Sequence, residues 1–246
     1  MLNWLFKTPS LPLDLSFLGA DMHSHLLPGI DDGVGDAQEA VAMIRQMKAY
    51  GYHHLITTPH IIWDCYRNTP ATIAEGLQTV RAACAEAGLD IQLDAAAEYF
   101  LDEHFSELLS AGEPLLTLPG KRVLVELPYT TPLMNTPEIL FSIIGHGYQP
   151  VLAHPERYAY YHADPTIFQK LSDQGCELQL NALSLTGHYG EGVTRTAEWL
   201  LKHRLVTFLG SDAHRISHVE QLKKLTKRKD LKDYPFQNYK LSPKGI

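Results

Sequence analysis

A thirteen-residue segment near the start of the chain, DMHSHLLPGIDDG at 21–33, combines residue types that bind metal ions. His23 and His25 are one residue apart, and alternate residues of a β-strand point to the same face. If the segment ends a strand, this spacing directs two imidazoles at one point. Asp31 and Asp32 follow in an Asp-Asp-Gly turn. Residue chemistry alone does not choose between these two carboxylates as a further ligand.

The sequence alternates between strand-like and helix-like segments. Strand-like patterns occupy residues 17–25, 53–60, 91–100, 122–129, 149–157, 177–184 and 205–214. Helical patterns follow them at 36–51, 69–88, 102–112, 136–148, 164–175, 191–204 and 219–225. This alternation predicts a parallel sheet with helices outside it. At 246 residues, the fold class that we expect is α/β, a single-domain (β/α)7 barrel.

The repeated units leave no convincing gap for a domain boundary, so we expect a single domain over residues 1–246. Residues 1–17 would lead into the first strand. Residues 228–246 lose the periodicity and would form a C-terminal extension, which we expect to be a solvated tail.

In α/β barrels the active site lies at the carboxyl ends of the strands. Six of the seven expected strand ends carry a histidine, an aspartate or a glutamate. Beyond the first segment, these side chains are His60, Glu98, Glu126, His154, Asp212 and His214. Four other histidines fall in expected helices, where we interpret them as surface or packing residues: His104, His146, His203 and His218.

The candidate ligands mix imidazoles and carboxylates, and no cysteine lies among them. Such a set suits manganese, iron or zinc rather than a thiolate-bound structural zinc. A single catalytic zinc takes about three protein ligands. Eight or nine candidates therefore imply two or three ions that share a bridging carboxylate.

Composition excludes several other classes of protein. The formal charge is −7, from 21 basic and 28 acidic residues, which argues against a nucleic-acid surface. Cys65, Cys84 and Cys176 are scattered and odd in number, so they imply no disulfide framework. The first residues resemble neither a secretory signal nor a membrane span, and no segment is apolar enough to insert in a membrane. We therefore expect a cytoplasmic protein.

The strand-end motifs resemble those of the polymerase and histidinol phosphatase (PHP) superfamily. Its most similar branch is the bacterial capsule-type tyrosine-protein phosphatases. The segments DMHSHLLPGIDDG, TTPH, AAAEYF, VELPY, LAHPER and GSDAH occur in the order of that family, between residues 21 and 214. The Asp-Asp-Gly turn and the ELPY segment are specific to this branch, whereas the other motifs are more widely shared.

The resemblance implies a distorted seven-stranded barrel that holds three metal ions, with manganese expected first and iron or zinc as alternatives. The first ion would be held by His23, His25, Glu98 and Asp212. Glu98 would bridge to a second ion, held also by Glu126 and His154. The third ion would be held by Asp32, His60 and His214. The motif thus favours Asp32 over Asp31, and Asp21 would accept a hydrogen bond behind the ligands.

The resemblance also implies catalytic arginines. Arg157 matches the arginine that binds substrate phosphate in the family, and its planar fork suits that role. The family's second arginine lies a few residues beyond the last histidine, whereas here Arg215 directly follows His214. Arg215 is therefore a second candidate phosphate ligand at an irregular position. Trp63 and Tyr66 could line the site for a phenyl ring, or could pack in the core.

The activity implied is hydrolysis of phosphotyrosine by a hydroxide that the metals generate from water. None of the three cysteines is followed by an arginine six positions on, so the Cys-x5-Arg motif of sulfur-based tyrosine phosphatases is absent. The implied partner is a membrane-bound tyrosine autokinase of capsular or exopolysaccharide synthesis. Three alternatives stay open: a small-molecule phosphatase similar to histidinol phosphatase, an amidohydrolase, and a PHP module without activity. The oligomeric state is not indicated.

Overall fold

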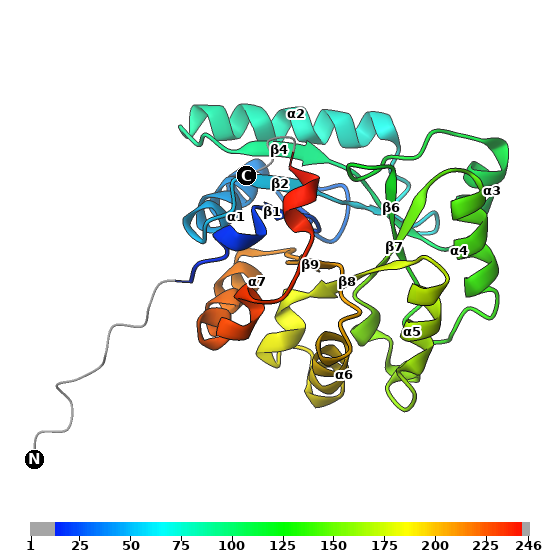
Figure 1. Cartoon of the computed structure of the whole chain (residues 1–246). Helices are drawn as coiled ribbons and strands as arrows, with labels where there is room; N and C mark the ends of the chain where they lie inside the picture. Colours follow the sequence, from blue (N-terminus) through cyan, green and yellow to red (C-terminus); the bar gives the residue numbers. More distant parts are fainter. Residues whose placement is uncertain (1–12, 243–246) are drawn as a thin grey trace, which may run out of the picture.

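The computed structural model describes residues 13–242, with strands at the centre of the molecule and helices around them (Figure 1). The strands are β1 Ala20–Asp21, β2 His54–Thr57, β3 His60–Ile61, β4 Gln92–Ala95, β5 Glu98–Phe100, β6 Arg122–Glu126, β7 Gln149–Ala153, β8 Glu177–Asn181 and β9 Phe208–Gly210. The α-helices are α1 Ala37–Ala49, α2 Pro70–Glu86, α3 Glu103–Ala111, α4 Thr136–Gly145, α5 Thr166–Asp173, α6 Glu191–Lys202 and α7 Ile216–Gln221.

All the paired strands are parallel, and they form two sheets with the orders β1-β2-β4 and β3-β5-β6-β7-β8-β9. Only two residues separate β2 from β3, and two separate β4 from β5, so each pair continues one run of extended chain. Backbone bonds bridge these breaks, from the Ala96 N–H to the Thr57 carbonyl and from the Glu98 N–H to the Pro59 carbonyl. The two sheets therefore follow one another as seven strand positions.

The ring of strands closes between its first and last members. Ser24, after β1, pairs in parallel with Ala213, after β9. Two backbone hydrogen bonds accompany this bridge, from the His25 N–H to the Ala213 carbonyl at 3.0 Å and from the Asp212 N–H to the His23 carbonyl at 2.7 Å. The predicted single-domain α/β fold, a distorted seven-stranded barrel, is confirmed.

Local sequence explains where the first two helices begin. The Asp36 side chain accepts a hydrogen bond from the Glu39 N–H at 2.9 Å, which satisfies one of the free N–H groups at the start of α1. Thr69 and Thr72 exchange reciprocal side-chain to backbone bonds at the start of α2, and Pro70 occupies its first position. Both helices begin within a residue of the predicted positions.

The apolar interior has two parts. The larger cluster lies between the strands and the surrounding helices. A smaller cluster is made by Met22, Ile56, Ala96, Leu118, Leu124, Val151, Ala153, Phe208 and Leu241. Most of these residues come from strands. They fill the barrel as side chains do in other α/β barrels, and leave the carboxyl ends of the strands to polar residues.

The C-terminal segment contradicts the expected solvated tail over residues 228–242. Leu231, Phe236 and Leu241 are buried, and Leu241 lies in the smaller core cluster. The Asn238 side chain donates to the Ala20 and Leu209 carbonyls and accepts from the Leu209 N–H. It thus joins the first and last strands. The segment folds as short 3₁₀ turns, so its apolar residues lack the helical or strand period that sequence patterns detect.

The expected ends of the chain are only partly described. Residues 1–12, most of the expected lead-in, and residues 243–246 lie outside the described range. Within residues 13–242, no helix combines the length and the apolar composition of a membrane span.

Candidate metal centre

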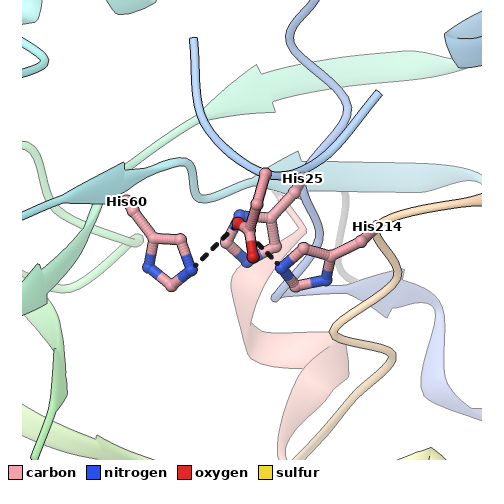
Figure 2. Close-up of side chains that lie close together, drawn as sticks. His25, His60 and His214 are labelled. Carbon is pink, nitrogen blue, oxygen red and sulfur yellow. Dashed lines mark ion pairs between the residues drawn. The ribbon is translucent and has the colours of Figure 1, made fainter. Parts of the chain in front are cut away.

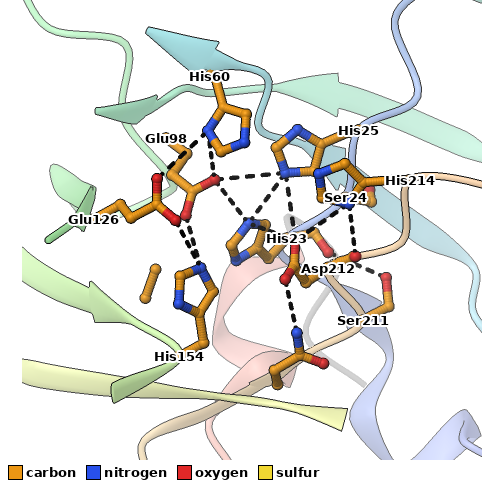
Figure 3. Close-up of polar contacts among 12 residues, drawn as sticks. His23, Ser24, His25, His60, Glu98, Glu126, His154, Ser211, Asp212 and His214 are labelled. Atoms are coloured by element: carbon orange, nitrogen blue, oxygen red, sulfur yellow. Dashed lines mark hydrogen bonds and ion pairs between the residues drawn. The ribbon is translucent and has the colours of Figure 1, made fainter. Parts of the chain in front are cut away.

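All nine predicted metal ligands converge at the carboxyl ends of the strands, and Figure 3 labels all of them except Asp32. They come from segments far apart in the sequence. His23 and His25 follow β1, Asp32 lies in the next loop, His60 begins β3, Glu98 begins β5, Glu126 ends β6, His154 follows β7, and Asp212 and His214 follow β9. The pairing of β3 with β5 places His60 directly opposite Glu98. The barrel thus brings together the residues that the sequence motifs separate.

Glu98 lies at the middle of the cluster and is fully buried. Its Oε2 is 3.2 Å from the His23 Nε2 and 3.1 Å from the His60 Nδ1. Its Oε1 is 3.1 Å from the His154 Nε2. Glu126 lies beside it, with Oε1 3.5 Å from the same nitrogen of His154. One carboxylate therefore contacts imidazoles on both sides, as expected of a ligand shared between ions.

A second part of the cluster surrounds Asp32. The Asp32 Oδ1 is 3.4 Å from the His60 Nε2 and 3.3 Å from the His214 Nε2. Figure 2 shows the rings of His25, His60 and His214 gathered in this part of the cluster. The rings of His25 and His214 stack with centroids 3.9 Å apart. The Asp32 side chain is 53% exposed, whereas His25 is fully buried. This part of the cluster therefore faces solvent, and the Glu98 part lies deeper in the barrel.

The donor atoms fit metal ions. Four sets of them have all their atoms within 4.8 Å of one another. The sets are His25, Asp32, His60 and His214; His23, His154 and Asp212; His23, His25 and Glu98; and His60, Glu98 and Glu126. The His60 Nδ1 is buried and makes no hydrogen bond despite its closeness to Glu98. A buried nitrogen that has no hydrogen-bond partner and lies beside carboxylates is suited to bind a cation.

The crowded carboxylates of the cluster also favour the binding of cations. Burial disfavours the imidazolium of His23, but the carboxylates of Glu98 and Asp212 outweigh it and raise the pKa of His23 to about 9. Burial, reinforced by the charge of Glu98, raises the pKa of Glu126 to about 7. Protons are thus retained where negative charge is crowded. Divalent cations would meet the same need and release those protons.

Two side chains behind the cluster orient its first two imidazoles. The His23 Nδ1 is 2.9 Å from the Gln179 Oε1, and the His25 Nδ1 is 2.8 Å from the Asp31 Oδ2. Each contact assigns the Nδ1 proton and leaves Nε2 free to face the cluster. Asp31 also accepts a hydrogen bond from the His60 N–H at 3.1 Å. Asp31 and Asp32, which residue chemistry did not distinguish, thus occupy different places.

Asp21 is buried and accepts hydrogen bonds from the N–H and hydroxyl of Ser211, both at 2.8 Å. Those bonds tie the first strand to the segment that carries Asp212.

His154 and Asp212 both have left-handed backbone conformations, with φ of 33° and 48°. Such a conformation costs a non-glycine residue about 1–3 kcal/mol. The fold holds both side chains at the cluster despite this cost.

The two candidate catalytic arginines differ in their surroundings. The Arg157 Nη1 donates to the Asp212 Oδ2 at 2.7 Å, and its guanidinium lies over the rings of Tyr129 and Tyr189. Arg215 is exposed, and its Nε donates to the His218 Nε2 at 2.9 Å. Arg157 is therefore held directly against the cluster, whereas Arg215 is held through a helical histidine.

The loop after β3 carries two aromatic residues, of which Tyr66 contacts a predicted ligand. The Tyr66 ring stacks over His60 with centroids 5.8 Å apart. Trp63 is 38% exposed and stacks on His104 at 3.8 Å. His104 thus supports an exposed aromatic ring. The interpretation of Trp63 as a core residue is excluded.

Sequence comparison assigns the family of this site. Residues 19–234 match the model of the family described as capsular polysaccharide synthesis, CpsB/CapC. The chain belongs to this family. The match includes every predicted metal ligand and both candidate arginines, so the resemblance seen in the strand-end motifs is confirmed.

Named relatives of the CpsB/CapC family agree with this assignment. The tyrosine-protein phosphatase YwqE of Bacillus subtilis (strain 168) is 27% identical over 196 residues, covering 80% of this chain and 77% of that protein. The tyrosine-protein phosphatase CpsB of Streptococcus pneumoniae is 26% identical over 201 residues, covering 80% and 83%.

Solved structures show the same relationship. A structure from a study of YwqE and CpsB, described as unique metal-dependent tyrosine phosphatases, matches with a TM-score of 0.78 and 25% identity over 89% of each chain. A histidinol phosphate phosphatase from Lactococcus lactis, complexed with zinc, L-histidinol and phosphate, matches with a TM-score of 0.52 and 15% identity, covering 88% of this chain and 93% of that one. The latter shares the fold alone.

The separate places of Asp31 and Asp32 lead to a prediction on metal content. Asp32→Asn should remove one bound ion, because a neutral amide replaces the carboxylate between His60 and His214. Asp31→Asn should keep the full number of ions but weaken their binding by about 10- to 100-fold, as loss of an orienting partner does. Elemental analysis at saturating metal, followed by titration of the metal-free proteins, distinguishes the two. Equal ion counts for both variants would contradict the assignment.

Proposed function

We propose that this protein is a metal-dependent protein-tyrosine phosphatase that acts on a tyrosine autokinase of capsular or exopolysaccharide synthesis. The observation that carries the proposal is the convergence of nine imidazole and carboxylate ligands at one end of the barrel in a member of the CpsB/CapC family. The named relatives supply the substrate class, phosphotyrosine in protein.

We propose that the cluster holds three ions, with manganese as the expected metal and iron or zinc as alternatives. The first would be held by His23, His25, Glu98 and Asp212; the second by Glu98, Glu126 and His154; and the third by Asp32, His60 and His214. When bound, such ions polarise phosphoryl oxygens and lower the pKa of coordinated water toward about 7.

The chain itself supplies the contacts that orient the phosphoryl group. Among residues 13–242, the hydrogen bond of the Arg157 guanidinium to Asp212 uses Nη1 only, so Nε and Nη2 are free to donate to phosphoryl oxygens. Arg215 adds positive charge farther out on the same rim. Tyr66, whose ring stacks on His60, offers an apolar surface to the phenyl group of the substrate. The exposed ring of Trp63 in the same loop is a second candidate for this contact. A phenolate leaving group, with a pKa of about 10, departs far more readily than an alkoxide.

A sulfur nucleophile has no support in this fold. Cys84 and Cys176 are buried, and burial raises the pKa of both thiols, that of Cys176 to about 12. A reactive cysteine needs the opposite shift. Cys65 is exposed, but no arginine follows it at the spacing that the sulfur-based enzymes use. All three thiols are free, which is consistent with the cytoplasmic location that we propose.

The proposal is tested by phosphate release from three esters: a phosphotyrosine peptide, a phosphoserine peptide of the same sequence, and histidinol phosphate. Each is assayed after chelation and after addition of manganese, iron or zinc. We expect the phosphotyrosine peptide to have the highest kcat/KM and chelation to abolish turnover. Preference for histidinol phosphate would favour the small-molecule alternative. Absence of hydrolysis with every metal would overturn the proposal.

A further inference from the structure

A four-residue loop, Gly187-His188-Tyr189-Gly190, contacts Arg157 and the histidine that accepts the hydrogen bond of Arg215. We refer to it as the 187–190 loop. It connects the 3₁₀ helix Ala182–Thr186 to α6. Gly187 and Gly190 both have positive φ, 78° and 90°, a conformation that glycine adopts without strain. The two glycines thus permit the backbone turns on either side of His188 and Tyr189.

Tyr189 is linked to the cluster of predicted metal ligands through Arg157 and Asn181. Its ring lies 4.4 Å from the Arg157 Cζ, and its hydroxyl accepts a hydrogen bond from the Asn181 Nδ2 at 3.3 Å. The same Asn181 nitrogen donates to the Asp212 Oδ2 at 2.7 Å. That oxygen also accepts from the Arg157 Nη1. Arg157 and Asn181 therefore donate to the same oxygen of Asp212, and Tyr189 contacts both of them.

The ring of Tyr189 restrains the guanidinium without neutralising it. A cation over an aromatic face is attracted by the electron-rich ring. A neutral ring also leaves the remaining N–H donors free. A long arginine side chain otherwise loses rotamer freedom when it binds a ligand, and this loss weakens binding. An arginine that is held in place beforehand avoids that loss.

His188 makes the corresponding contact on the side of Arg215. Its ring packs edge-to-face against the His218 ring, with centroids 5.2 Å apart. The His218 Nε2 accepts the hydrogen bond from the Arg215 Nε at 2.9 Å. Burial, followed by the charges of Arg215 and Arg157, lowers the pKa of His188. The loop is thus linked to Arg157 by the direct contact of Tyr189 and to Arg215 through His218.

We propose that the 187–190 loop positions the two arginines for the phosphoryl group. Tyr189 holds Arg157 directly, and His188 holds Arg215 through His218. Both are positioning residues, since each acts through an arginine. The inference rests on the proposed function, because it assumes that these arginines bind the phosphoryl group.

The test measures binding of inorganic phosphate to the manganese-loaded protein by titration calorimetry, together with KM and kcat for the phosphotyrosine peptide. For Tyr189→Leu we expect the phosphate Kd and the KM to rise about tenfold, the size of one lost cation–π restraint. Tyr189→Phe keeps the ring and should stay within about twofold of wild type. Metal content should not change. Tyr239→Leu, at an exposed tyrosine near the C-terminus, is the matched control and should behave as wild type.

A double-mutant cycle decides whether Tyr189 acts through Arg157. In the Arg157→Ala background, Tyr189→Leu should have no further effect on the phosphate Kd. In the Arg215→Ala background, His188→Ala should likewise have no further effect on the phosphate Kd. The inference is overturned if Tyr189→Leu leaves the phosphate Kd unchanged, if Tyr189→Phe loses as much as Tyr189→Leu, or if the effects persist without the arginines. Because phosphate binding is measured without an ester, a wild-type protein that prefers histidinol phosphate would refute the proposed function and still test the loop.

Discussion

Glu98→Gln is expected to lower kcat/KM for a phosphotyrosine peptide by about 1,000-fold, which corresponds to about 4 kcal/mol of transition-state stabilisation. The physical reason is the central position of the carboxylate, which contacts the imidazoles of His23, His60 and His154 through both of its oxygens. An amide keeps the shape but loses the charge and one of the two acceptor oxygens. In the proposed arrangement Glu98 is shared by two ions, so its loss would also remove several kcal/mol of charge stabilisation.

The loss should also appear in a measurement that needs no turnover. Ligands that bind only the native state raise Tm, so chelation should lower the Tm of the wild-type protein. In Glu98→Gln this effect should be much smaller, because less metal is bound. Glu113→Gln, at an exposed glutamate after α3, is the matched control and should resemble wild type. Full metal content in Glu98→Gln with unaltered kcat/KM would contradict the central role of Glu98.

The strand-end rule explains why so much of this site could be predicted from sequence. A ligand such as Glu98 follows a recognisable strand, and parallel strands of a barrel place their carboxyl ends together. Each position could therefore be located without knowing any contact. Glu126 and His154 were located in the same way, as the polar residues that end buried apolar runs.

The residues that support these ligands lack such a signal. Gln179 lies in the middle of β8, where alternation predicts only that it faces into the barrel, and its contact with His23 is 156 positions distant in sequence. The sequence indicates Asn181 only as the end of a strand and gives no sign of its hydrogen bond to Asp212. His218 was expected to be a surface or packing residue of a helix, yet it accepts the hydrogen bond of Arg215. Each role depends on a pairing between distant segments, which periodicity cannot show.

The two aspartates of the first motif illustrate the same limit. Asp31 and Asp32 are adjacent and chemically identical, and only the turn that carries them separates their directions. The turn aims Asp31 inward at the His25 Nδ1, where burial opposes its ionisation but the charge of His25 holds its pKa at about 2. Asp32 points to the solvent side of the cluster. Asp32, the residue that the family resemblance favours, is the one whose carboxylate lies with His25, His60 and His214 in a possible metal-binding set.

Arg157→Ala is expected to lower kcat/KM for phosphotyrosine by about 100-fold or more. In the role that we propose, Arg157 donates charge-assisted hydrogen bonds to the phosphoryl group, and the substitution would remove them. The fall should include kcat, since charge on the phosphoryl oxygens is stabilised during the reaction. The contact of Arg157 with Asp212 adds a second consequence. Metal affinity should fall by about tenfold when this orienting donor is lost, although Asn181 still donates to the same oxygen.

Saturating metal separates the two roles of Arg157. If the arginine served only to orient Asp212, excess manganese would restore full activity to Arg157→Ala. We expect it to restore the metal content alone, with turnover still low and inorganic phosphate bound weakly. Arg157→Lys should recover part of the activity, because it keeps the charge and loses the planar fork.

Arg215→Ala is the paired variant. The Arg215 guanidinium is exposed, and its side-chain hydrogen bond goes to His218 and not to a predicted metal ligand. Arg215→Ala should therefore weaken phosphate binding and leave metal affinity unchanged. Full turnover by metal-saturated Arg157→Ala would show that this arginine serves the cluster and not the substrate, and the phosphoryl group would then have to be bound by the metals and Arg215.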